Sequence, residues 1–247
     1  MRSFLIITAL IYYTCSAQQA FLSNAGALIS IREQTFLSVL GDAYNSEEGL
    51  YHNRDTIFLT GDWIHNASNR CFDSILTGWV FLRGNNQHIG GKNITHFYNL
   101  VLSGQGTKYG DTDVVVNGTL FLTDKEFNLD DNTVYVTSSN TSSVERTSGF
   151  VSSLEDGGLS RATASDSTYL FPVGSSLGIF RYRPVEISPK SKNFNRFKVR
   201  FANADPSTEG FDRNKKFHLV CQINPQWYHK IWRTDGSDSA NIYWRSR

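Results

Sequence analysis

The chain has 247 residues, with 24 basic and 23 acidic side chains and a formal net charge of +1. This near-neutral balance gives no compositional support for nucleic acid or an anionic membrane as a partner. The length exceeds the roughly 150 residues of a typical domain, although all-β folds often reach 200 or more in a single unit. One elongated unit and two packed units therefore both remain open.

The N-terminus has the pattern of a secretory signal peptide. Arg2 precedes an apolar run from Phe4 to Tyr13, and small residues follow before the chain becomes polar. The run of about 10 residues is too short for a membrane-spanning helix, which needs about 20. We predict a signal peptide over residues 1–17, cleavage after Ala17 and Sec-dependent export, with lipid modification of Cys15 as the alternative. The expected location is secreted or at the outer cell surface, with no transmembrane segment in the mature chain.

The first segments of the mature chain alternate apolar and polar residues. Ala27–Ile31 and Thr35–Leu40 have the two-residue period of half-buried strands. We interpret them as the opening rung of the fold. Between this rung and Asp55, the residues of Ala43–Asn53 are mostly polar, and they predict a loop.

Short β-favouring runs then recur, each bounded by a Gly, Asn or Asp turn. They are Thr56–Thr60, Trp79–Leu82, Phe97–Leu102, Val114–Val116, Leu120–Leu122 and Val134–Val136. Spacings of roughly 20 residues without helical periodicity are typical of a solenoid of stacked coils. We therefore assign residues 18–145 to a parallel β-solenoid-like region.

The repeat also predicts which side chains face the interior and which form the corners. The expected interior residues are Ile57, Leu59, Val80, Leu82, Leu100, Leu102, Val114, Val116, Leu120 and Leu122. Glycine and asparagine recur between the runs because corners require backbone conformations that other side chains resist. Asparagine amides at corners can also form hydrogen bonds from one coil to the next.

The composition changes after Val136, where Thr137–Ser143 and Ser148–Ser167 are rich in Ser, Thr, Asn and Gly. This shift predicts a boundary near residues 140–150 and a β-sandwich-like region over residues 146–247. Its expected strands are Thr168–Gly174, Tyr182–Ile187, Phe194–Ala202 and Lys216–Val220. The predicted class is all-β, a parallel β-solenoid-like part followed by a β-sandwich-like part.

The last two β-favouring runs, Ile231–Thr234 and Ala240–Trp244, predict a hairpin. Strands of a sandwich need partners, and the sequence stops soon after this hairpin. We therefore expect either a natural end or a truncated C-terminus.

A series of short motifs carries a resemblance to a known class of proteins. The motifs are Gly61-Asp62-Trp63, Ile89-Gly90-Gly91, Phe97-Tyr98-Asn99-Leu100, Val116-Asn117-Gly118-Thr119-Leu120 and Thr168–Gly174, with Gly149-Phe150-Val151 and Arg161 between them. In this order they resemble secreted surface proteins of the Bacteroidetes of the gliding-motility-associated, type IX secreted kind. The resemblance implies an adhesive or structural role at the cell surface and transfers no catalytic residue. Such proteins normally end in a sorting domain, which this sequence does not show.

The polar residues give no signature of catalysis, of cofactor binding or of a metal site. The histidines lack HExxH, HxH and cysteine-paired spacing: His52, His65, His88, His96, His218 and His229. The clustered acids most simply cap turns, with acid–base or calcium chemistry as the alternative: Asp111, Asp113, Asp124, Glu126, Asp130 and Asp131. No GxSxG or glycine-rich phosphate motif precedes a helix. We predict no catalytic, cofactor-binding or metal-ligating residue and no cofactor.

Aromatic residues offer the remaining functional signal. Core packing explains them most simply, and a carbohydrate-stacking surface is the alternative: Trp63, Trp79, Trp227, Tyr228, Trp232, Tyr243 and Trp244. Cys71 and Cys221 either pair after export or remain separate thiols. The sequons at Asn66, Asn93, Asn117 and Asn140 have meaning only in a eukaryotic secretory pathway.

These observations lead to two functional hypotheses. The first is a non-enzymatic secreted or cell-surface protein for structure or adhesion, with envelope proteins or surface glycans as partners. The second is a β-helix that binds or cleaves polysaccharide. Product release, or saturable sugar binding, separates the second hypothesis from the first.

Overall fold

The computed structural model describes residues 21–73 and 77–244, and their regular structure is almost entirely β, which confirms the predicted class. The predicted signal peptide, with its cleavage after Ala17, lies outside the described residues. Within the described ranges, every helix is too short to traverse a bilayer.

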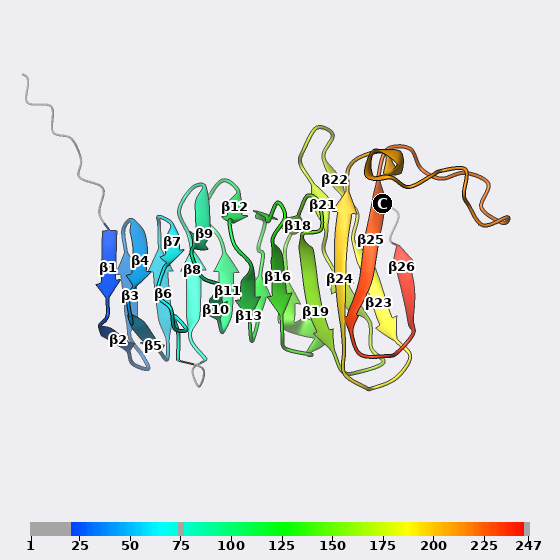
Figure 1. The fold of residues 1–247 in the computed structure, drawn as a ribbon. Coiled ribbons are helices and arrows are strands. Elements are labelled where there is room, and N and C mark those ends of the chain that lie inside the picture. The colour runs from blue at the N-terminus through cyan, green and yellow to red at the C-terminus, as the bar shows by residue number, and fades with distance from the viewer. Residues whose placement is uncertain (1–20, 74–76, 245–247) are drawn as a thin grey trace, which may run out of the picture.

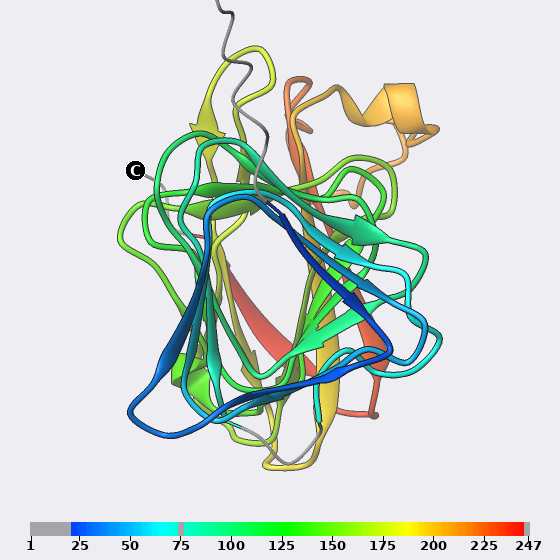
Figure 2. The same ribbon diagram turned by 90° about the vertical axis from the view of Figure 1, so that its left-hand side faces the viewer.

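The N-terminal part is a parallel solenoid whose coils stack along one axis and enclose a three-sided interior (Figures 1 and 2). The first face is a seven-stranded sheet of β1 (Phe21–Ala25), β4 (Asp42–Ser46), β7 (Trp63–His65), β9 (Gln87–Gly91), β12 (Lys108–Gly110), β15 (Glu126–Asn128) and β18 (Phe150–Ser152). Every neighbouring pair in this sheet is parallel, as the sequence predicts for a solenoid.

Two further faces complete each coil. The second is β3 (Phe36–Val39), β6 (Thr56–Leu59), β8 (Trp79–Leu82), β11 (Asn99–Leu102), β14 (Leu120–Phe121) and β17 (Val144–Glu145). The third begins with the pair β2 (Leu28–Ile31) and β5 (Leu50–Asn53) and continues as β10 (Thr95–Phe97), β13 (Val114–Val116), β16 (Thr133–Val136) and β19 (Gly158–Thr163).

The interior is a continuous apolar stack in register from coil to coil. Leu100, for example, pairs with Val80 on one side and with Leu120 on the other. All ten predicted interior residues are at most 2% exposed, which confirms that part of the prediction. Fully burying an aliphatic side chain of this size contributes roughly 1.5–3 kcal/mol. The stack therefore supplies much of the driving force for folding.

Polar side chains hold the corners of the coils. Lys108 is buried, and its ammonium group donates to the carbonyl oxygens of Gly84 at 3.0 Å and Asn85 at 2.6 Å. Burial lowers the pKa of Lys108 to about 8. The Asn99 carboxamide accepts from the Thr119 amide at 2.9 Å, so a corner amide bonds to the backbone of the next coil. Gly91 adopts a φ of +119° with its Cα close to the backbone of the preceding coil, where a side chain would collide.

The prediction of a polar loop at Ala43–Asn53 is wrong, because this segment forms most of β4 and β5. Its inward positions include Asn45 and Asn53, which are at most 2% exposed. The Asn45 amide donates to the Gly49 carbonyl at 2.7 Å. Buried asparagines that cap corners interrupt the apolar alternation, and this is why the strands escape a pattern based on hydrophobicity.

Parallel coils extend past the composition change near residue 145. The strands β17, β18 and β19 each pair in parallel with the preceding coil. The Ser- and Thr-rich stretches are therefore corners and connections of the last coils, and one of them contains the short 3-10 helix η1 (Thr141–Ser143). Antiparallel pairing begins at β19, whose other edge pairs with a later strand, and one isolated parallel bridge joins Val151 to Val173 beyond it.

Beyond β19 the chain forms antiparallel sheets. The strands β24 (Asn195–Ala202) and β25 (Tyr228–Asp235) extend the third face of the solenoid, so one sheet spans both parts. Behind them lie β20 (Tyr169–Phe171), β23 (Val185–Pro189) and β26 (Ala240–Trp244), with the small pair β21 (Gly174–Ser175) and β22 (Arg181–Tyr182) nearby (Figure 1). Buried side chains from both sheets belong to the same core as the solenoid.

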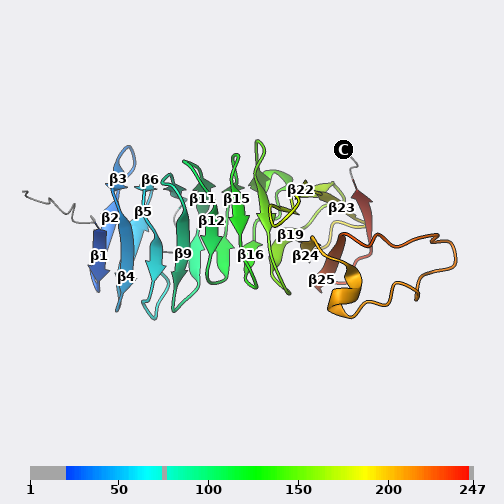
Figure 3. The ribbon, with the colours of Figure 1, turned by 90° about the horizontal axis from the view of Figure 1, so that it is seen from above.

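Two strand predictions in this part are wrong. The last two strands do not form a hairpin, because β25 pairs with β24 whereas β26 pairs with β23 in the other sheet. Lys216–Val220 is not a strand, since β24 already has β19 and β25 on its two sides. Instead residues 203–227, with the 3-10 helix η2 (Pro206–Glu209), extend away from the body (Figures 1 and 3).

A buried arginine joins the solenoid to the antiparallel part. Arg161 on β19 is fully buried and donates to the carbonyl oxygens of Leu170 at 2.5 Å and Thr141 at 3.0 Å. Burial lowers the pKa of Arg161 to about 10, so the guanidinium stays charged at neutral pH. Carbonyl dipoles from both parts of the chain therefore hold its charge, and the two parts are tied together at this point.

Candidate functional site

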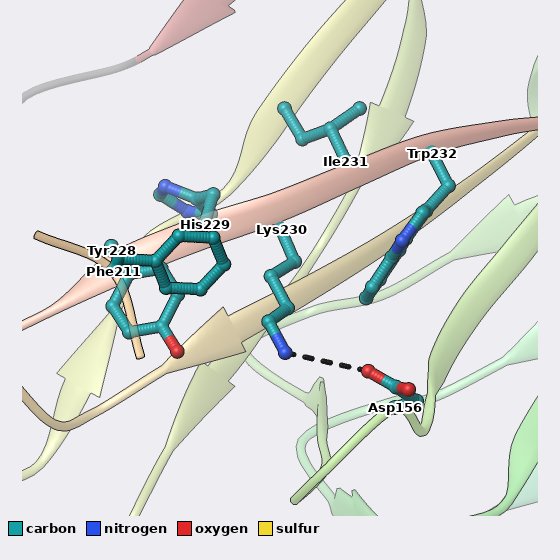
Figure 4. Close-up of a pocket in the computed structure, with 7 residues that line it drawn as sticks. All are labelled: Asp156, Phe211, Tyr228, His229, Lys230, Ile231 and Trp232. Carbon is teal, nitrogen blue, oxygen red and sulfur yellow. Dashed lines mark hydrogen bonds and ion pairs between the residues drawn. The ribbon is translucent and has the colours of Figure 1, made fainter. Parts of the chain in front are cut away.

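The outer surface of β25 contains a hollow of about 480 Å³, which we call the β25 groove. It is lined by Asp156, Phe211, Tyr228, His229, Lys230, Ile231 and Trp232 (Figure 4). Most of these residues belong to β25 itself, whereas Asp156 precedes β19 and Phe211 follows η2. The groove thus lies where the long excursion 203–227 meets the antiparallel extension of the sheet.

Strand alternation explains how β25 presents the groove. Tyr228, Lys230 and Trp232 lie on the outer face, because successive side chains of a strand point to opposite sides. Ile231 packs against the apolar core on the other side. The His229 ring contacts the Arg183 carbonyl at 2.8 Å, and burial lowers the pKa of this histidine.

The aromatic side chains form two walls with a lysine between them (Figure 4). The rings of Phe211 and Tyr228 meet edge to face with centroids 5.6 Å apart. The Lys230 ammonium lies 5.6 Å from the Phe211 centroid and 5.9 Å from that of Trp232. The groove therefore combines flat apolar surfaces with a cation.

An ion-pair network reaches the groove through Lys230. Glu209 receives two hydrogen bonds from the guanidinium of Arg200, at 2.8 and 2.7 Å, and an ion pair from Lys230 at 2.6 Å. The bonds from Arg200, with that of Lys230, lower the pKa of Glu209 to about 2. Two-point pairing of this kind is geometrically specific, so the network orients Lys230 beneath the aromatic walls.

A second lysine and an exposed carboxylate form the rim. The Lys198 ammonium lies 4.7 Å from the Trp232 centroid and donates to the Asp156 carbonyl at 2.7 Å. The Asp156 carboxylate lies 3.4 Å from the Lys230 ammonium, and its side chain is 79% exposed. The rim thus combines the Lys198 ammonium, held by a backbone carbonyl, with the solvent-exposed carboxylate of Asp156.

The aromatic residues singled out from the sequence fall into separate places. Tyr228 and Trp232 meet in the groove, whereas Trp63 is buried in the solenoid core, 1% exposed. Trp79 lies on the second solenoid face and Trp244 on the edge strand β26. The others contribute at different positions: Trp227 packs against Phe201, and Tyr243 is exposed on β26.

Sequence reasoning missed Phe211, Lys198 and Lys230 as site residues. The alternating pattern Tyr-x-Lys-x-Trp over 228–232 was a signal for one polar and aromatic strand face. Phe211 and Lys198 come from other segments, and only the folded chain brings them to the same place.

The clustered acids do not converge on one site. Asp113 accepts from the Thr133 amide in the next coil at 2.8 Å, a corner role of the expected type. Asp111 instead lies 3.0 Å from the His88 ring, and Asp124 pairs with Lys125. Glu126 contacts Ser176, and Asp130 occupies a turn with φ of +45°. Within residues 21–73 and 77–244, no group of three or more potential ligands could hold a metal ion.

Cys71 and Cys221, the two cysteines among the described residues, are separate thiols in the structure. Cys71 is buried in the solenoid, whereas Cys221 is exposed on the excursion 203–227. Burial raises the pKa of the Cys71 thiol. Their different surroundings favour the interpretation without a disulfide.

A second aromatic surface lies on the outer side of the second solenoid face. The rings of Phe58 and Phe81, on adjacent coils, contact in a tilted arrangement with centroids 5.1 Å apart, and the ring of Trp79 lies 6.2 Å from that of Phe81. The Arg83 guanidinium already covers Phe58 at 4.4 Å from the ring centroid. This surface lies outside the groove and offers a matched control for it.

No family model, no curated protein and no solved structure matches this chain. The geometry of the groove is therefore the main indication of function, and the resemblance to type IX secreted surface proteins stays a prediction.

Proposed function

We propose that this chain is a non-enzymatic protein of the outer cell surface or the secreted fraction, and that it acts in adhesion or surface structure. In this proposal the solenoid is a rigid support that presents the β25 groove to a surface glycan, and envelope proteins are a further class of partner. The signal pattern of residues 1–17 supports export. The continuous buried stack supports the role of a rigid support.

One observation carries the proposal: two aromatic walls flank a fixed lysine in an open hollow on the surface (Figure 4). Aromatic rings offer large, rigid contact area, and apolar faces of sugar rings fit such surfaces. A few placed polar groups then set the orientation of the ligand. Tyr228, Trp232 and Lys230 have these properties on one strand face.

The second hypothesis, polysaccharide cleavage, has less support from the same groove. Glycoside hydrolysis needs one carboxylic acid that stays protonated to donate to the leaving group. Glu209 has the opposite tendency, since Arg200 and Lys230 lower its pKa to about 2. Asp156 is largely exposed beside a lysine. These carboxylates suit a binding groove better than an acid–base pair.

The test is a glycan-binding screen of the mature chain together with a depolymerisation assay on the same glycans. We expect saturable binding without release of reducing ends. Trp232→Ala should weaken binding about fivefold or more, because loss of one stacking aromatic in a groove costs about 1–2 kcal/mol. The matched control, Trp79→Ala, removes a tryptophan outside the groove and should leave affinity unchanged. Product release would support the second hypothesis, and equal losses in the two variants would contradict the site.

A further inference from the structure

We propose that the β25 groove selects acidic glycans and that a uronate carboxylate binds between the ammonium groups of Lys198 and Lys230. This inference rests on the proposed function, and it adds the chemical class of the ligand. It also assigns a role to Asp156, whose side chain occupies the position that the ligand carboxylate takes.

The outer face of β24 and β25 is rich in cationic side chains. Arg196, Lys198 and Arg200 alternate along the outer face of β24, beside Lys230 on β25. Glu209 engages the guanidinium of Arg200 by two hydrogen bonds, and it also contacts Lys230. Among the residues that the structure describes, no carboxylate pairs with Lys198, which donates to a backbone carbonyl. The face therefore carries cationic charge beyond what Glu209 neutralises.

Two lysine side chains lie close to the ring of Trp232. Lys198 and Lys230 lie 4.7 and 5.9 Å from the centroid of its ring. A sugar that contacts the indole thus has an ammonium group within reach of its substituents from each of two strands. A carboxylate attached to a pyranose ring can approach these cations while the ring contacts the aromatic wall. A neutral sugar would offer no carboxylate to Lys198, whose ammonium group donates to a backbone carbonyl.

The Asp156 carboxylate is exposed and only loosely paired. Its carboxylate approaches Lys230 at 3.4 Å while its side chain is 79% exposed. Exposed ion pairs of this kind contribute little to stability, typically about 0–1 kcal/mol. A ligand carboxylate can therefore displace this side chain at small cost. Lys198 would stay in place, because it bonds to the backbone carbonyl of Asp156 and not to its carboxylate.

Removal of an acidic side chain from the groove should therefore raise the affinity for an acidic glycan. Asp156→Asn removes an anion that competes for Lys230 and repels the ligand. We expect the affinity for a uronate oligosaccharide to rise about two- to fivefold. Lys198→Gln should weaken the same binding about fivefold or more. Both substitutions lie at the rim, so melting temperatures should stay close to that of the unmodified chain.

The experiment is titration calorimetry with three ligands of similar length: an oligogalacturonate, its methyl ester, and a sulfated oligosaccharide that contains no uronate. We expect the acid to bind most tightly, the ester at least tenfold more weakly, and binding of the acid to weaken as salt screens the charges. Trp79→Ala serves as the control and should bind like the unmodified chain.

Equal affinity for acid and ester, or weaker binding by Asp156→Asn, would overturn the inference while leaving a neutral-glycan function intact. Tighter binding of the sulfated sugar would overturn the assignment to a carboxylate. If neither these ligands nor any glycan in the wider screen binds, the proposed function itself fails.

Discussion

The substitution Leu100→Asp tests the apolar stack on which the solenoid depends. Leu100 is fully buried between Val80 and Leu120. Removing the side chain forfeits roughly 1.5–3 kcal/mol of burial. The new carboxyl group must also stay neutral at pH 7, and a pKa shift of about 3 units costs about 4 kcal/mol. The expected loss is therefore about 5–7 kcal/mol.

The comparison is Asp111→Asn at the surface of the same solenoid. The Asp111 side chain is 54% exposed and lies 3.0 Å from the His88 ring. Asparagine keeps an acceptor there, so we expect a loss below about 1 kcal/mol. In a chain of this size 1 kcal/mol shifts the melting temperature by roughly 2–4 °C. Thermal and urea unfolding should therefore separate the two variants clearly.

A loss of about 5–7 kcal/mol is comparable with the whole stability of many proteins, about 5–15 kcal/mol. If Leu100→Asp does not fold, Leu100→Ala keeps the test open, with an expected loss of about 2–5 kcal/mol. Equal losses for Leu100→Ala and Asp111→Asn, or a larger loss at Asp111, would refute the argument. Asp111 would then become the first candidate for a bound ion.

Three further predictions concern charge and processing. The folded-state pKa of Glu209 is about 2, below its ordinary value of 4.5. The ionised Glu209 carboxylate therefore stabilises the folded protein above pH 4.5, and this stabilisation is lost as the pH falls toward 2. In urea titrations at several pH values, Glu209→Gln should reduce the acid-dependent loss of stability by about 1–2 kcal/mol, allowing for solvent screening. Lys108→Met should cost about 2–3 kcal/mol in thermal unfolding, because buried carbonyls lose their donor, whereas the exposed control Lys92→Met should be neutral. Mass spectrometry of the exported protein should find Gln18 at the N-terminus, and an acylated Cys15 there would refute that cleavage.

The solenoid could be predicted because the sequence features that produce it are local and recur in each coil. Each coil needs inward aliphatic residues at fixed spacing and small or amide residues at the corners, and Leu100 and its neighbours show this in the sequence. The segment with Asn45 and Asn53 was misjudged because the same inward positions there hold asparagines bonded to the backbone. A pattern of hydrophobicity cannot distinguish such residues from a loop.

The antiparallel part and the groove depended on pairings that the sequence does not state. Neighbouring strands in the chain, β25 and β26, join different sheets, so proximity in sequence misled the hairpin prediction. The groove needs Lys198 from β24, Trp232 from β25 and Phe211 from the excursion 203–227. Local patterns identify the strand face of Trp232, but only the fold brings the other two residues to it.

The most direct test of the β25 groove as a glycan site is a crystal structure of the protein soaked with an oligogalacturonate. We expect a sugar ring against Trp232, with its carboxylate between Lys198 and Lys230 and the side chain of Asp156 turned away. A sugar bound instead along Phe58, Phe81 and Trp79 of the solenoid would refute this site, as would a groove left without sugar at ligand concentrations that saturate binding in solution.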